Sequence, residues 1–152
     1  MSEQNIIEWD NRLAVRIPLI DNQHKKLLAM ANDLYFACNY STDSGKNQFE
    51  RTVHDAVAYI RYHFSTEGRI MERTSYPDRD DHNREHTEFI KKVLENVKAF
   101  EEGKLFVPFR FVRFLRDWVL SHIAITDSKL GIFLTGLQKT GKPGVITMKV
   151  QS

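Results

Sequence analysis

Apolar side chains recur along this chain at intervals of three and four residues in four long segments. In the first segment the recurring residues are Leu27, Leu28, Ala31, Leu34 and Tyr35. This spacing places apolar residues on one face of an α-helix, so the pattern predicts amphipathic helices. The four expected helices cover residues 21–40, 47–71, 81–101 and 108–137.

Residues that start or stop a helix separate these segments. Asp21 is a typical N-cap residue, and the polar segment 41–45 ends the first helix. Residues 76–78 predict a turn, after which Asp80 or Asp81 can cap the third helix.

Short connections between long amphipathic helices favour an all-α, up-down-up-down antiparallel four-helix bundle. At 152 residues, the chain has the length of one domain that buries its own core. We expect residues 1–137 to form this domain, with residues 1–20 as an N-terminal arm packed along the bundle. Residues 138–152 form a short C-terminal extension, in which only residues 145–150 show the alternation typical of a strand.

The composition argues against several classes of protein. The formal net charge is only +2 and no basic run interleaves with aromatic residues, so we expect no nucleic-acid partner. No uncharged apolar segment is long enough to span a bilayer, and the first residues lack a secretory signal. A single cysteine, Cys38, fits a reducing compartment. We therefore expect a cytoplasmic protein without a membrane partner.

Candidate metal ligands occur in pairs at helical spacing. His63 and Glu67 are four residues apart, as are His82 and His86, so each pair can point inward from one helix. One such pair alone is more typical of a solvated helix face. The full set of candidate ligands is His24, His63, Glu67, His82, His86, His122 and Asp127.

The expected topology brings this set to one level of the bundle. The first and third helices contribute their ligands near their starts, and the second and fourth near their ends. Antiparallel neighbours place starts beside ends, so all seven residues should lie together.

The sixth histidine, His54, is an internal control. It precedes His63 by nine residues, which at about 100° per residue rotates it roughly 180° away from the ligand face. We expect His54 on the surface or between helices, outside the metal site.

The spacing of His122 and Asp127 does not fit a regular helix. The two residues are five apart, or roughly 140°, which is too wide for side chains directed at adjacent metals. A π-type turn between Ser121 and Ser128, with i to i+5 hydrogen bonds, would bring them together. The alternative is that Asp127 reaches the site through side-chain rotation alone.

The chemistry of the ligands favours two metal ions. Imidazole binds iron, zinc, copper and nickel, whereas carboxylates favour harder ions and can bridge two centres. A structural zinc ion needs about four ligands and usually includes cysteine, which this set lacks. If Glu67 and Asp127 bridge, the five histidines divide into three and two, which leaves one metal a vacant position for a small molecule.

With these motifs the chain resembles the bacterial hemerythrins. The resemblance covers roughly residues 9–134 and rests on residues 20–27, 63–67, 71–89 and 118–127. It implies one iron ion bound by His82, His86 and His122 and a second bound by His24 and His63. Glu67 and Asp127 would bridge the two iron ions together with an oxo or hydroxo group, and dioxygen would bind the second ion.

The vacant position should face apolar side chains that exclude water. The expected oxygen pocket consists of residues beside or one turn from ligands: Leu27, Leu28, Phe64, Trp118, Val119 and Ile123. Such residues are also core residues in any helical bundle. At one position the chain departs from the family pattern, because Leu130 stands where members often carry a tyrosine.

Three classes of function are compatible with such a site. The resemblance favours an oxygen carrier, store or delivery protein over an enzyme. An oxygen or redox sensor would act through a separate protein, which the sequence does not identify, because this chain contains no signalling domain. A diiron oxidase, peroxidase or nitric oxide scavenger is the third class, although ferritin-like diiron enzymes use Glu-x-x-His motifs that this site does not repeat.

Overall fold

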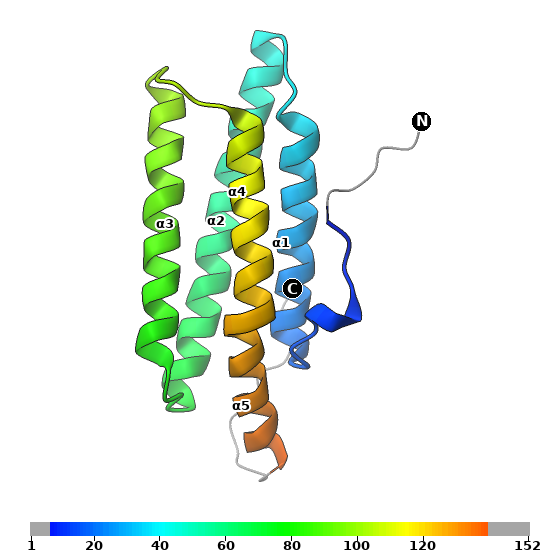
Figure 1. Ribbon diagram of the computed structural model, residues 1–152, viewed down its shortest axis with the longest axis vertical. Helices are drawn as coiled ribbons and strands as arrows, with labels where there is room; N and C mark the ends of the chain where they lie inside the picture. The colour runs from blue at the N-terminus through cyan, green and yellow to red at the C-terminus, as the bar shows by residue number, and fades with distance from the viewer. Residues whose placement is uncertain (1–6, 140–152) are drawn as a thin grey trace.

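The computed structural model describes residues 7–139, which form an antiparallel four-helix bundle (Figure 1). Its helices are α1 (Pro18–Ala37), α2 (Asp43–Arg73), α3 (Arg79–Glu101) and α4 (Pro108–Ser121). The π-helix η2 (His122–Asp127) and α5 (Ser128–Lys139) continue α4 as one rod, and the short helix η1 (Asn11–Leu13) lies in the arm. α1 packs against α2 and α4, and α2 packs against α3. The described residues contain no strand, so the predicted all-α bundle is confirmed.

α1 begins at Pro18 rather than at Asp21. Proline suits the first turn of a helix, where a backbone N–H has no partner within the helix. Asp21 lies inside this turn, where its carboxylate accepts hydrogen bonds from the backbone N–H groups of Val15 at 2.8 Å and Arg16 at 3.1 Å. Arg16 has a φ of 66°, in the left-handed region that reverses the chain between the arm and α1 (Figure 1). Asp21, which we expected to cap the helix, therefore binds the backbone of the arm instead.

The loop between α1 and α2 lies earlier than predicted. α1 ends at Ala37, and α2 begins at Asp43, inside the segment 41–45 that we expected to be non-helical. The cause is Thr42, whose hydroxyl accepts a hydrogen bond from the Gly45 N–H at 3.0 Å and so caps α2.

The start of α3 also differs from the prediction. Asp78 occupies the cap position, and Asp80 and Asp81 lie in the first turn, where the helix dipole favours negative charge. At the other end of the chain, α5 extends to Lys139. Most of the expected C-terminal extension, including residues 145–150, lies outside the described residues.

Apolar clusters fill the bundle on both sides of a polar layer. The larger cluster includes Leu27, Phe64, Phe89, Phe111 and Leu115. The cluster at the opposite end includes Ile20, Met71, Tyr76, Leu130 and Leu134. Along the chain, each set of predicted metal ligands lies between a residue of one cluster and a residue of the other, with Tyr76 preceding α3. The fold therefore encloses these ligands between two apolar regions.

The arm adds an outer layer beside this polar region. Ile7 and Trp9 pack with Leu28 of α1 and Val119 of α4. The side chain of Asn32 holds the arm in place, because it accepts from the Ile7 N–H at 3.0 Å and donates to the Ile7 carbonyl at 2.8 Å.

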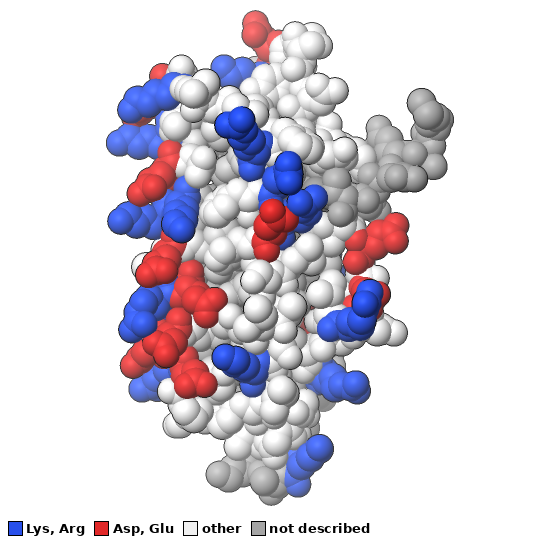
Figure 2. Space-filling view, viewed as in Figure 1, with Lys and Arg blue, Asp and Glu red and all other residues white. Residues whose placement is uncertain are grey.

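Positively and negatively charged side chains are intermixed along α3 in Figure 2. This face of α3 therefore does not present the basic stripe that is typical of a nucleic-acid binding surface. Within residues 7–139, no helix combines the length and the apolar composition that crossing a bilayer requires.

Replacing Gly131 by alanine should destabilise the protein, because α5 touches the arm at this glycine. A Cβ atom at Gly131 would lie 2.5 Å from the carbonyl oxygen of Val15 and 2.8 Å from its Cβ, so the arm must shift. Such overpacking costs about 1–3 kcal/mol, and we expect a lower Tm in thermal unfolding.

Gly136→Ala, in the same helix, is the matched control. A Cβ atom at this position has no neighbour within 4 Å, so Tm should stay the same or rise. Equal loss of stability in the two variants would contradict the close contact between the arm and α5.

Candidate metal centre

All seven predicted metal ligands are buried in one layer of the bundle. They form two groups that share Glu67 and Asp127. One group adds three histidines and the other adds two, as follows: His82, His86 and His122; His24 and His63. The structure thus brings the whole predicted set together.

The π-helix η2 accounts for the spacing of His122 and Asp127. The backbone N–H of Ser128 donates to the carbonyl of Ile123, five residues earlier, as in a π-type turn. Both ligand side chains consequently point into the bundle, with His122 Nε2 3.3 Å from Asp127 Oδ1. The predicted π-type turn is confirmed, and side-chain rotation alone is not the explanation.

Many polar atoms in this layer have no hydrogen-bond partner. They include both carboxylate oxygens of Glu67 and of Asp127, and the Nε2 atoms of His24, His63 and His82. Buried polar groups are almost always paired, and an unpaired buried carboxylate is especially costly. Metal ions at the points where these lone pairs converge would satisfy them, so the residues present fit such ions.

The distances between these atoms are those of neighbouring ligands around an ion. His24 Nε2 lies 2.9 Å from Asp127 Oδ2, but the two groups are not aligned for a hydrogen bond. His86 Nε2 lies 2.9 Å from His122 Nε2. Adjacent ligands of an octahedral ion, each about 2.1 Å from the metal, are about 3 Å apart.

Both carboxylates lie between the two groups of histidines. Asp127 Oδ1 is 3.2 Å from His82 Nε2, and Asp127 Oδ2 is 2.9 Å from His24 Nε2. Glu67 Oε1 is 3.2 Å from His63 Nε2 and 3.3 Å from a histidine Nε2 of the other group. This is the placement that bridging ligands require.

The histidines keep both carboxylates ionised. Burial raises the pKa of Glu67, but the surrounding histidines, His63 foremost, favour the ionised carboxylate more strongly and hold that pKa well below its ordinary value. Burial and the charge of Glu67 raise the pKa of Asp127, but the three histidine rings within 3.3 Å of its oxygens outweigh both effects, so this pKa is also lowered. The two carboxylates therefore contribute two negative charges to the layer, which suit multivalent cations.

His82 holds a proton in the metal-free protein. Burial lowers its pKa, but the neighbouring carboxylates of Asp127, at 3.2 Å, and Glu67, at 3.7 Å, have the larger combined effect and raise the pKa to about 9. A metal ion that binds His82 at neutral pH must displace this proton.

Gln23, which sequence reasoning missed, fixes the orientation of His63. The Thr66 hydroxyl donates to the Tyr62 carbonyl at 3.1 Å and accepts from Gln23 Nε2 at 3.2 Å. Gln23 Oε1 therefore faces His63 Nδ1, at 2.7 Å, and accepts a hydrogen bond from it. The lone pair of His63 Nε2 is then free for a metal ion. No spacing rule identified Gln23, because it adjoins His24 instead of lying one turn from a ligand.

A small cavity lies beside the two-histidine group. Asp127, His24, His63 and His122 contribute to its wall, and its volume is about 10 Å³. This is close to the space that one water molecule needs, so the cavity suits a very small ligand.

Five of the six predicted pocket residues line this cavity: Leu27, Phe64, Trp118, Val119 and Ile123. Leu28 does not, because it follows Leu27 by one residue and is turned toward the arm, where it packs with Ile7. The cavity is also lined by Ile60 and Phe89, which the prediction missed. Each lies three residues from a histidine ligand, so a systematic search one turn to either side of every ligand would have found both.

His54 lies on the surface, as expected for a histidine outside the ligand face. Its side chain is 54% exposed, and its Nε2 atom lies 3.1 Å from Glu101 Oε1 and 3.9 Å from Glu50 Oε1.

Known proteins share both the sequence pattern and the fold. Residues 15–131 match the family described as the hemerythrin HHE cation binding domain. The chain is 30% identical over 122 residues to the bacteriohemerythrin of Stenotrophomonas maltophilia, which covers 80% of this chain and 77% of that protein. It is 29% identical over 124 residues to the myohemerythrin of Theromyzon tessulatum, over 80% and 88% of the two chains. A crystal structure of wild-type hemerythrin has the same fold, with a TM-score of 0.80 at 24% identity, over 86% of this chain and 98% of that one.

Metal uptake by the metal-free protein should strengthen as the pH rises. Because the pKa of His82 is about 9, protons compete with the metal at any lower pH. From about pH 7 to about pH 8.5, we expect the apparent affinity for Co²⁺ to rise about tenfold per pH unit, as the displacement of one proton requires. Titration with Co²⁺, followed by visible absorption, measures this slope.

The control for this titration is His54→Ala, which should show the same slope because His54 lies outside the site. An affinity that does not change with pH over this range would contradict the raised pKa of His82.

Proposed function

The chain belongs to the hemerythrin family, and we propose that it binds dioxygen reversibly at a centre of two iron ions. The proposal is supported chiefly by the buried, unpaired ligand atoms, which form two groups that share Glu67 and Asp127. The division of the histidines into three and two leaves one ion a ligand short, on the side where the apolar cavity lies.

Each ligand has a role in this proposal. The three-histidine group would hold one iron ion and the two-histidine group the other, and Glu67 and Asp127 would contribute to both, together with an oxo or hydroxo group. Imidazole and carboxylate donors suit iron. When bound, the iron pair supplies the electrons for the capture of dioxygen and regains them on its release.

Stacked aromatic rings orient the histidines and close the site. The Phe64 ring stacks on the His86 ring at 3.7 Å, and the Trp118 ring stacks on the His122 ring at 4.3 Å. These contacts restrict rotation of both imidazoles and exclude water from the cavity side of the centre. Exclusion of water protects a bound ligand from side reactions and so favours its release unchanged.

The size of the cavity supports a carrier, store or delivery protein over an enzyme. With a volume of about 10 Å³, the cavity has room for one small molecule but not for an organic substrate beside it. Dioxygen is the partner that we propose.

Protein produced with ample iron should contain two iron atoms per chain. His63→Ala should lose at least half of this iron, because it removes one of two histidines that hold the second ion. His54→Ala is the matched control on the same helix and should keep the wild-type content. Metal analysis of the three proteins measures the difference.

Either of two outcomes would contradict the metal assignment. One is purification with a single zinc ion and no iron from iron-rich medium. The other is an equal loss of iron in His54→Ala and His63→Ala.

The reduced protein should take up dioxygen and release it again when dioxygen is removed, over several cycles. Visible absorption of the iron centre follows each cycle. Rapid reduction of dioxygen to water or hydrogen peroxide in the presence of a physiological reductant would instead show an enzyme.

A further inference from the structure

Glu85 is an acid on the surface of α3 that contacts a metal ligand on another helix. We propose that Glu85 is a positioning residue for His122, which it holds in the metal-binding tautomer and makes a stronger electron donor. The inference rests on the proposed metal centre and adds to it a residue that tunes the oxidation state of one ion.

The contact fixes the proton on His122. Glu85 Oε1 lies 3.4 Å from His122 Nδ1. A carboxylate only accepts hydrogen bonds, so Nδ1 carries the proton and donates it. The lone pair of Nε2 is then free on the inner side, where this atom lies 2.9 Å from His86 Nε2 and 3.3 Å from Asp127 Oδ1.

Thr126 holds the Glu85 carboxylate in place. The Glu85 side chain is 47% exposed, and such a side chain ordinarily samples several rotamers. The Thr126 hydroxyl lies 2.9 Å from Oε1 and 3.1 Å from Oε2 and donates to the carboxylate. Thr126 belongs to the π-helix η2, so the widened turn that directs His122 and Asp127 inward also presents this hydroxyl to α3.

One histidine in each group is therefore supported by a different kind of acceptor. His63, beside the cavity, donates to the neutral amide of Gln23 at 2.7 Å. His122, in the three-histidine group, donates to a carboxylate. A charged acceptor increases the basicity of the ring and its donation to a metal ion, whereas an amide mainly orients the ring. Glu85 thus favours the ferric state of the ion that His122 holds.

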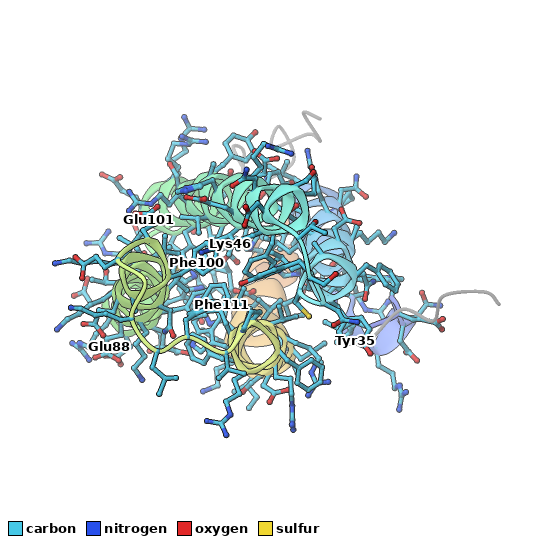
Figure 3. The ribbon with its side chains drawn as sticks, turned by 90° about the horizontal axis from the view of Figure 1, so that it is seen from above. Tyr35, Lys46, Glu88, Phe100, Glu101 and Phe111 are labelled. Carbon is cyan, nitrogen blue, oxygen red and sulfur yellow. The ribbon has the colours of Figure 1, made fainter. Side chains whose placement is uncertain are left out.

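Glu88 provides a matched control on the same helix. It lies one turn from Glu85, it is exposed, and its side chain extends from α3 away from the neighbouring helices (Figure 3). Glu88→Gln removes the same charge as Glu85→Gln but leaves the contact with His122 intact.

The first test compares the two variants as iron-loaded, full-length proteins. Glu85→Gln should keep the fold and raise the midpoint potential of the centre, because the ferric state loses a nearby negative charge. Its affinity for Fe²⁺, measured by competition with a chelator, should fall about tenfold. This is the lower end of the usual loss when a metal-binding histidine loses its carboxylate acceptor, because Glu85 is half exposed. Glu88→Gln should match the wild type in both measurements, and identical results for the two variants would overturn the role of Glu85.

Thr126 variants distinguish the effect of the position of the Glu85 carboxylate on the midpoint potential from the effect of its charge. Thr126→Val removes the hydroxyl but leaves Glu85 charged, so the potential should rise by less than in Glu85→Gln. Thr126→Ser restores the hydroxyl and should restore the wild-type potential. An unchanged potential in Thr126→Val would overturn the part assigned to Thr126.

A third measurement needs no iron. Nitrogen-15 NMR of the metal-free protein should show the proton of His122 on Nδ1 in the wild type and a mixture of tautomers in Glu85→Ala, which removes the acceptor. A wild type that takes up no iron would contradict the proposed function alone. A His122 tautomer that does not respond to Glu85→Ala would overturn this inference, whatever the iron content.

Discussion

Two buried carboxylates surrounded by five histidines are the constraint on which the rest of this structure depends. Glu67 and Asp127 lie between apolar clusters, with 0% and 1% of their surfaces exposed. An uncompensated charge in such a place costs several kcal/mol, and no lysine or arginine is among the groups that lie within hydrogen-bond distance of these oxygens in the described residues. The polar layer is therefore stable only with cations or protons, and the ligand chemistry selects metal ions.

The π-helix η2 determines which side chains of this segment reach the site. In a regular helix His122 and Asp127 would diverge, and the centre would lose either a histidine or a bridge. The widened turn directs both residues inward and leaves Thr126 facing α3, where it holds the Glu85 carboxylate against His122. One local departure from α-helical geometry thus directs two proposed ligands inward and places the Thr126 hydroxyl against Glu85, which contacts one of them.

The sequence predicts most of the fold and of the ligand layer because both follow from helical periodicity. Ligands at i and i+4 share a face whatever the surroundings, and the five-residue interval of His122 and Asp127 requires a π-type turn. Periodicity does not decide how side chains pair across helices. Asp21 was expected as a cap, but it bonds to the arm instead. Gln23 and Glu85 act through contacts with other helices, which depend on rotamers and helix packing, so spacing along the chain gives no sign of them.

X-ray diffraction at the iron absorption edge, from crystals of the iron-loaded protein, tests the central claim most directly. The account predicts two anomalous peaks, both between Glu67 and Asp127. One should adjoin His24 and His63, and the other should adjoin the remaining three histidine ligands. A single peak, or a peak that neither carboxylate contacts, would contradict the claim that this layer is a diiron centre.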